Sequence, residues 1–211
     1  YYSLTGDQKA LDHVTKSIDK MILGGIYDHV GGGFCRYSVD SKWQIPHFEK
    51  MLYDHALIIE IIAILYKFNP QERYWEVIGK SLIFFDSYLR SGSLLHSSID
   101  ADSEGEEGKF YSWNLEELHN ILGEDFDLFK KHMSLIPFED DLHFIITGKS
   151  NIEEVNLSFE SFKSRESQMN RLADYRSKRI WPSIDNKTIL AWNALMVSTY
   201  CTLFRISEQK D

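Results

Sequence analysis

The chain has 211 residues, of which 43% are apolar and 14% are aromatic, so it can bury a substantial core and is not a disordered chain. Its net charge is −9 and no basic patch stands out, which argues against a nucleic-acid partner and against binding to an anionic membrane surface. No apolar run is long enough to span a bilayer, and the N-terminus lacks a signal-peptide pattern.

Apolar residues at helical spacing predict three helices in the first half of the chain. Asn69 and Pro70 separate the second stripe from the third, which favours an antiparallel hairpin of two helices. The stripes are Leu11, Val14, Ile18 and Ile22; Phe48, Met51, Leu52, His55, Ile59, Ile62 and Tyr66; and Tyr74, Val77, Ile78, Leu82, Phe85, Tyr88 and Leu89.

The second half of the chain also reads mainly as helix. Asn114 is a plausible N-cap for a short helix that ends at Leu122, before Gly123. Residues 136–156 are expected to be irregular. Further helices are expected over residues 125–133, 159–178 and 186–206.

Strand signals are confined to two small β-hairpins, one from residues 33–38 and 42–45 and one from residues 94–97 and 109–113. There is no alternating strand–helix rhythm, so we predict an all-α domain with these hairpins inserted in its long loops. In an antiparallel ring of helices, alternate connections lie on the same face. The long loops rich in Gly, Trp, Tyr, Asp and His should therefore gather on one face and form a site there.

The stretch "GGIYDHVGGGFCRYSVDSKWQIPHFEKMLYD" carries the first two motifs. Its five glycines need a positive φ or a close backbone approach, and no phosphate-binding GxxxxGK[ST] is present. Pro46 is expected at a helix start, which places His47 and Glu49 in the first turn. His47 could act there as a general acid or base, because the pKa of histidine lies near neutrality. Alternatively, His47 and Glu49 only cap the helix.

The acidic loop "IDADSEGEEGKFY" is similar to a calcium loop, but the twelfth position from Asp100 is Tyr111 and not a carboxylate, and the flanks read as strands. We therefore predict no metal site. Asp100 and Asp102 are two residues apart and should face the same way, as a catalytic carboxylate pair requires. The three glutamates of this loop, Glu104, Glu106 and Glu107, are expected to face water.

A last motif, "RIWPSIDNKTILAWNAL", begins the C-terminal helix. Asp185 is placed to cap this helix or to act in a site. Trp192 and Asn193 could stack on and hydrogen-bond to a sugar, although Trp192 could equally be a core ring. The two cysteines, Cys35 and Cys201, form no CxxC pair, so we interpret both as reduced thiols of a cytoplasmic protein.

These stretches together resemble the helical domain of the YyaL and spermatogenesis-associated thioredoxin-domain family. The resemblance implies part of an (α/α)6 toroid, similar to those of N-acylglucosamine 2-epimerase and the six-hairpin glycosidases. The pattern gives about seven helices, too few for a ring of twelve. We therefore expect residues 1–211 to form a single helical domain, a fragment of a larger toroid without the family's thioredoxin-like domain. The remaining toroid and thioredoxin-like segments of the full-length chain are its expected partners.

Two hypotheses of function follow. The first is a carbohydrate-acting enzyme, an epimerase, isomerase or glycoside hydrolase, in which His47 transfers a proton and Asp100, Asp102 or Asp185 is the second acid or base. The second is a non-catalytic toroid that serves as a binding or scaffold module beside a redox domain. Neither needs a metal ion or cofactor. The expected substrate-binding residues are Arg36, Tyr37, Trp43, Glu49, Tyr111, Trp113, Trp192 and Asn193.

Overall fold

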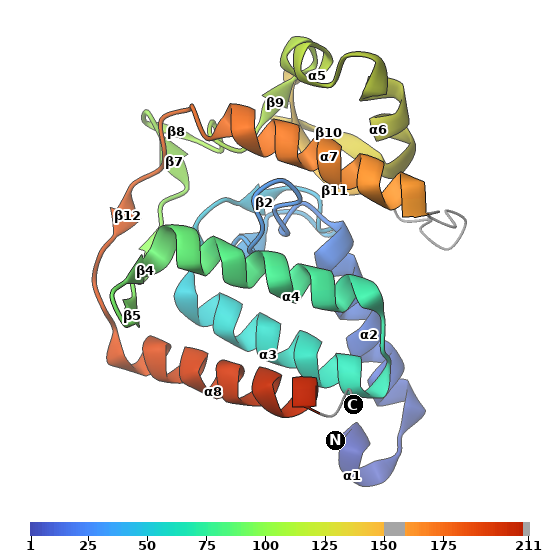
Figure 1. Ribbon diagram of the computed structural model, residues 1–211, viewed down its shortest axis with the longest axis vertical. Helices are drawn as coiled ribbons and strands as arrows, with labels where there is room; N and C mark the ends of the chain where they lie inside the picture. The colour runs from blue at the N-terminus through green and yellow to red at the C-terminus, as the bar shows by residue number, and fades with distance from the viewer. Residues whose placement is uncertain (150–158, 209–211) are drawn as a thin grey trace.

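The computed structural model describes residues 1–149 and 159–208, and this part of the chain is mostly helical with small antiparallel sheets (Figure 1). Helices α2, α3, α4 and α8 form one layer, and α5, α6 and α7 lie above it. No described helix is both long and apolar enough to cross a membrane. The helices are α1 (Tyr2–Thr5), α2 (Gln8–Leu23), α3 (Leu52–Phe68), α4 (Glu72–Phe84), α5 (Leu115–Leu122), α6 (Phe126–His132), α7 (Phe159–Arg176) and α8 (Leu190–Ser207).

The predicted helices are present, and their local signals explain several of the ends. Asp7 caps α2 by accepting a hydrogen bond from the backbone N–H of Lys9 at 3.1 Å. The expected cap at Asn114 is confirmed as a capping box, in which Asn114 and Glu117 each accept a hydrogen bond from the other's backbone N–H. Helices α3 and α4 form the predicted antiparallel hairpin around Asn69 (Figure 1).

Two helix starts were predicted too early. Helix α3 begins at Leu52 rather than at Pro46, because Pro46–His47 and Lys50–Met51 pair with other strands. Helix α8 begins at Leu190 rather than near Asn186, because Asp185 lies in a strand. Helix α4 continues as a π-helical turn, Phe85–Leu89.

The stretch expected to be irregular contains a regular antiparallel pair, which corrects the prediction for residues 136–148. Strand β10 (Met133–Phe138) pairs with β11 (Asp140–Gly148), and β9 (Trp113–Asn114) pairs with the other edge of β11. The chain reverses at Glu139, which has φ 60. The remainder of the predicted irregular stretch, residues 150–156, lies outside the described residues.

A second three-stranded sheet joins three of the sequence motifs. Its central strand, β6 (Ser98–Ile99), pairs with β3 (Lys50–Met51) on one side and with β12 (Ile184–Asp185) on the other. The loops that carry the polar motifs are therefore neighbours. Three two-stranded hairpins complete the structure: β1 (Tyr37–Ser38) with β2 (Pro46–His47), β4 (Arg90–Ser91) with β5 (Leu94–Leu95), and β7 (Asp102–Ser103) with β8 (Glu106–Glu107).

The predicted pairing of residues 94–97 with 109–113 is wrong, because the acidic loop closes on itself. Glu104 and Gly105 both have positive φ, 55 and 79, and connect β7 to β8 as a two-residue turn. The flanking segments are then free to pair elsewhere, so Leu95 pairs with Arg90 and Trp113 with Phe144.

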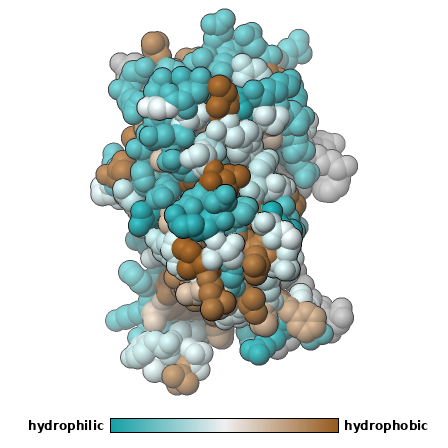
Figure 2. All heavy atoms as spheres, turned by 90° about the vertical axis from the view of Figure 1, so that its left-hand side faces the viewer, coloured by the Kyte–Doolittle hydropathy of each residue, from teal (hydrophilic) through white to brown (hydrophobic). Residues whose placement is uncertain are grey.

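Two helices leave an apolar stripe in solvent. Figure 2 shows brown side chains gathered in the lower middle of the face that it presents. On each helix the exposed positions recur at helical spacing, so each stripe forms one continuous face. The exposed residues are Leu57, Ile61, Ile64 and Phe68 on α3, and Leu190, Val197 and Phe204 on α8.

A buried group of charges connects the Gly-rich loop, residues 24–33, to the two layers of helices. The carboxylate of Asp28 accepts hydrogen bonds from Lys50 Nζ at 2.8 Å and from both terminal nitrogens of Arg176 at 3.0 and 2.8 Å. Burial opposes ionisation of Asp28, but these two cations outweigh it and hold its pKa far below the usual range. Gly31 is required beside them, since a Cβ there would lie 2.2 Å from Arg176.

We predict that Arg176→Met destabilises the fold by about 3–5 kcal/mol, because it leaves Asp28 and Lys50 buried without full compensation. Chemical denaturation at pH 7 measures this change. Arg90→Met is the matched control: Arg90 pairs with Asp86 in solvent, and its loss should change the stability little. Equal effects of the two substitutions would contradict the prediction.

The depressed pKa of Asp28 also sets a pH dependence. Its stabilising contribution is complete above the unfolded-state pKa of about 4 and is lost as the pH falls below that value.

Candidate functional site

His47 lies in a strand at the surface and not in the first turn of a helix, which corrects the expected position. In strand β2 it pairs with Tyr37 of β1, and the two rings stack with their centroids 4.9 Å apart. The ring is held from one side by Tyr37, and its side chain is 24% exposed. A substrate can therefore reach this histidine.

Two carboxylates bracket the His47 ring. Glu107 Oε1 lies 2.6 Å from Nδ1 and also accepts a hydrogen bond from the backbone N–H of Phe48 at 3.3 Å. Glu49 Oε2 lies 3.7 Å from Nε2. The short contact with Glu107 favours the tautomer with its proton on Nδ1, which leaves the lone pair of Nε2 for proton transfer.

Arg36 completes this side of the site. Its Nη1 donates a hydrogen bond to Glu49 Oε2 at 3.0 Å, and its backbone N–H bonds to the carbonyl of Glu49 at 2.8 Å. The pair is partly exposed, so it contributes little to stability. A guanidinium and a carboxylate at the surface can instead hydrogen-bond to a polar ligand.

Asp54, in the first turn of α3, is the titratable group with the most unusual environment here. Burial raises the pKa of Asp54 to about 6 against the opposing effects of Arg36 and Tyr53, and Glu49 adds to the increase. Its Oδ2 is buried and has no hydrogen-bond partner among the described residues. Asp54 is therefore partly protonated near neutral pH and can donate or accept a proton. We call Arg36, Tyr37, His47, Glu49, Tyr53, Asp54 and Glu107 the His47 cluster.

The other three predicted acids lie outside direct contact with His47. Asp100 is held by the hydroxyl of Ser183, which donates to its Oδ2 at 3.0 Å. Asp102 is exposed on β7, opposite Glu107. Asp185 forms an ion pair with Lys187 at 2.5 Å and lies in β12, so it does not cap a helix as predicted. No acid among these three is placed to exchange a proton with His47.

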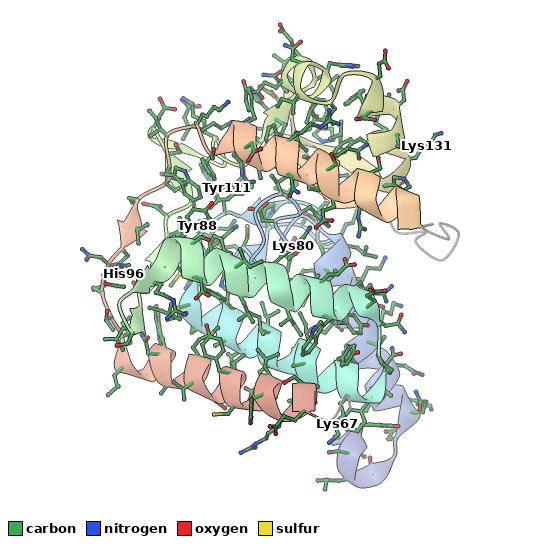
Figure 3. The ribbon with its side chains drawn as sticks, viewed as in Figure 1. Lys67, Lys80, Tyr88, His96, Tyr111 and Lys131 are labelled. Carbon is green, nitrogen blue, oxygen red and sulfur yellow. The ribbon has the colours of Figure 1, made fainter. Side chains whose placement is uncertain are left out.

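Most of the predicted substrate-binding residues outside the cluster have structural partners. Tyr111 is 7% exposed, stacks on Phe48 and lies between α4 and the upper layer (Figure 3). Trp113 is 1% exposed, with the Arg179 guanidinium over its ring at 4.2 Å. Asn193 binds both backbone groups of Leu95, at 2.9 and 3.0 Å.

The two remaining tryptophans differ in their relation to the cluster. Trp192 packs on Tyr53 with ring centroids 4.9 Å apart and so supports the cluster from α8. Trp43 is half-buried against the main core, and its carbonyl accepts a hydrogen bond from the backbone N–H of Gly25 at 2.7 Å.

Sequence reasoning missed Tyr53, Asp54 and Glu107. The sequence offered only a weak signal for the first two, their position in "HFEKMLYD", and Glu107 was expected to face water. Within the described residues, no group of three or more His, Cys, Asp and Glu side chains is arranged to hold a metal ion.

The sequence of the chain is similar to those of several mammalian proteins. Spermatogenesis-associated protein 20 of Homo sapiens is 33% identical over 94% of this chain and 30% of its own length, and that of Mus musculus is 32% identical over the same shares. The rat protein of the same name is 32% identical over 87% of this chain. No protein-family model matches. The chain is thus similar to spermatogenesis-associated protein 20 of three mammals and spans about three tenths of the length of these relatives.

Proposed function

We propose that the His47 cluster is the acid–base centre of a carbohydrate-acting enzyme, of the epimerase, isomerase or glycoside hydrolase type. The observation that carries the proposal is His47 itself, which lies between Glu107 and Glu49 at the surface, with Asp54 close enough to Glu49 for that charge to act on its pKa. The reactions named all need one group that takes a proton and one that gives it.

The roles of the two groups follow from their surroundings. His47 takes a proton at Nε2, and Glu107 stabilises the imidazolium that results. Asp54, whose pKa is raised to about 6 by burial, supplies the second proton transfer. This pair replaces the predicted pairing of His47 with Asp100 or Asp102.

The same cluster has the groups that recognise a sugar. Tyr37 is 49% exposed and offers an aromatic face for stacking against the apolar side of a pyranose ring. Arg36 and Glu49 provide a hydrogen-bond donor and an acceptor for hydroxyl groups beside it.

A non-catalytic binding or scaffold module is the second candidate. The observation that favours it is that Asp100, Asp185 and Asn193, all expected in the site, are engaged in contacts that hold the loops together. In that case the His47 cluster would bind a ligand without changing it.

We also propose that further helices of the full-length protein cover the exposed stripes of α3 and α8 and complete a toroid. The stripes support this proposal, because apolar faces of that regularity are rare on an isolated domain. The relatives are long enough to supply such helices, since the chain spans only three tenths of them.

We predict that His47→Gln lowers turnover of a carbohydrate by about 10²–10⁴-fold, the range for loss of an acid–base group. A panel of reducing sugars, their N-acetyl forms and glycosides, followed by NMR, identifies the substrate first. His96→Gln is the matched control, because His96 is partly exposed and lies outside the His47 cluster, and its ring bonds to the carbonyl of Asn186. If a panel sugar binds at His47 and is never converted, the binding module is correct instead.

We predict that Asp54→Asn removes a pH-dependent limb with an apparent pKa of about 6 from the rate profile. The substitution should leave the free energy of unfolding at pH 7 unchanged or increased, because folding raises the pKa of Asp54 and its ionised form therefore opposes folding above pH 4. Measuring both quantities separates a catalytic from a structural role. A profile that keeps its limb in the variant would remove Asp54 from the mechanism.

We predict that the double substitution Leu57→Glu and Val197→Glu destabilises the full-length protein much more than the 211-residue chain. Covered apolar positions cannot accept charges without a large desolvation cost, whereas exposed ones can. Thermal unfolding of both chains gives the comparison, and equal shifts in Tm would speak against covering helices.

A further inference from the structure

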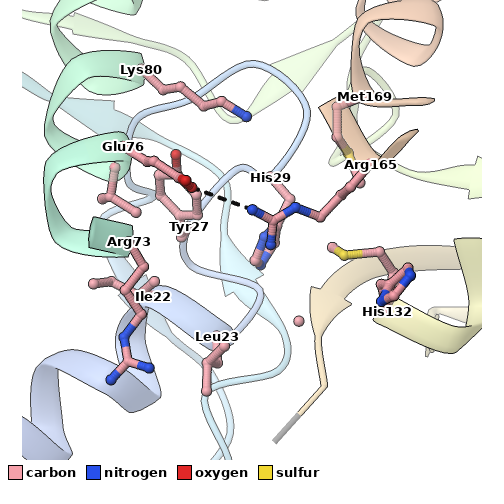
Figure 4. A pocket seen from close by; sticks show the side chains of 13 residues that line it. Ile22, Leu23, Tyr27, His29, Arg73, Glu76, Lys80, His132, Arg165 and Met169 are labelled. Atoms are coloured by element: carbon pink, nitrogen blue, oxygen red, sulfur yellow. Dashed lines mark hydrogen bonds and ion pairs between the residues drawn. The ribbon is translucent and has the colours of Figure 1, made fainter. Parts of the chain in front are cut away.

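A pocket of about 80 Å³ lies on a different part of the molecule from the His47 cluster (Figure 4). It is bordered by the end of α2, the Gly-rich loop, α4, the junction of α6 with β10, and α7. No residue of the His47 cluster lines it. One water molecule needs roughly 10–15 Å³ of such volume, so this pocket can hold a small ligand group.

Several hydrogen-bonding groups in this pocket have no partner. The hydroxyl of Tyr27 and both ring nitrogens of His132 are buried and make no hydrogen bond with the described residues. The ammonium of Lys80 makes neither a hydrogen bond nor an ion pair within the described part of the chain, and in Figure 4 it points into the pocket. Buried polar groups are normally paired, so this set indicates a missing ligand.

The positive charges around the pocket indicate that the missing ligand is an anion. Lys80 and Arg165 face the same space, and burial together with the Arg165 charge lowers the pKa of Lys80. The pKa of His132 is lowered by burial and, next, by Arg165. Among the described residues that line the pocket, Glu76 is the only carboxylate, and it already pairs with Arg165 at 3.3 Å. An anion between Lys80 and Arg165 would relieve their repulsion.

The directions of the donors point to a tetrahedral group. Lys80 comes from α4, Arg165 from α7 and Tyr27 from the Gly-rich loop, whereas the ring of His132 lies on the far side of Arg165 from Lys80 (Figure 4). Oxygens that point in several directions satisfy donors on several sides, whereas a planar carboxylate is best matched by a fork on one side.

We propose that this pocket binds a phosphate group, as inorganic phosphate or as the phosphate of a small ester. Lys80 and Arg165 provide the ionic contacts, the hydroxyl of Tyr27 donates a hydrogen bond, and Glu76 fixes the Arg165 guanidinium. The site uses side chains and not a Walker-type glycine loop, in agreement with the absence of GxxxxGK[ST]. It is additional to the sugar-acting function proposed above.

Isothermal titration calorimetry with inorganic phosphate, at constant ionic strength, tests the proposal. Saturable binding is expected in the unaltered protein, and Lys80→Met should weaken it about tenfold or more by removing a charge-assisted contact. Lys67→Met is the matched control: Lys67 is exposed on α3, away from the pocket in Figure 3, and the substitution makes the same change in net charge. Equal affinities of the unaltered protein and Lys80→Met would overturn the proposal.

A second variant tests whether weaker binding could come from a folding defect instead of from a lost contact. Tyr27→Phe removes only the unpartnered hydroxyl, so it should weaken phosphate binding while leaving the unliganded protein at least as stable. A variant that binds phosphate as tightly as the unaltered protein would remove Tyr27 from the site.

Titration with glucose 6-phosphate and with glucose separates the two sources of the phosphate group. Tighter binding of the ester than of inorganic phosphate assigns the pocket to a phosphorylated metabolite, and equal binding assigns it to the free ion. Saturable binding of neither phosphate compound would overturn the proposal. His47→Gln should leave all of these affinities unchanged, so failure of the sugar-acting function would not affect this result.

Discussion

The buried carboxylate of Asp28 is the constraint on which the arrangement of the loops depends. It needs two cations, and they come from distant segments: Lys50 from the strand before α3 and Arg176 from the last turn of α7. Lys50 is turned inward to Asp28, whereas the preceding residue, Glu49, is partly exposed beside His47. The surface site is thus oriented by an ion pair that it does not contain.

The helices from α2 onward could be predicted from the sequence because they are long enough to show their period or have clear end signals, whereas α1, of four residues, and the strands could not. Most strands are two residues long, and their partners are fixed by tertiary contacts: Ile99 pairs with both Lys50 and Ile184. The start of α3 was misplaced for a related reason. Phe48 and Met51 continue the apolar stripe of α3 but are buried in the preceding segment, so spacing alone could not separate strand from helix.

The candidate site was only partly visible in the sequence. His47 stands out because histidine is the side chain that titrates near neutrality. Asp54 does not, because an aspartate in the first turn of a helix is ordinarily a capping group, and the burial that mainly raises its pKa to about 6 is not visible in the sequence. In the sequence, Glu107 is one of three neighbouring glutamates that are expected to face water. It reaches His47 because the turn at Glu104 and Gly105 folds β8 back onto β7.

The Gly-rich loop relates the two candidate sites to each other. Tyr27 lines the pocket that contains Lys80 and Arg165. The next residue, Asp28, forms ion pairs with Lys50 and Arg176. The loop is pinned by a backbone bridge between Tyr27 and Phe34 and by close packing of Gly25 on the carbonyl of Gln44, 1.9 Å from where its Cβ would be. Because these contacts hold the loop, Tyr27 and Asp28 cannot shift independently of each other. The positions of the pocket's hydroxyl and of the strand that carries His47 are therefore set by the same few residues.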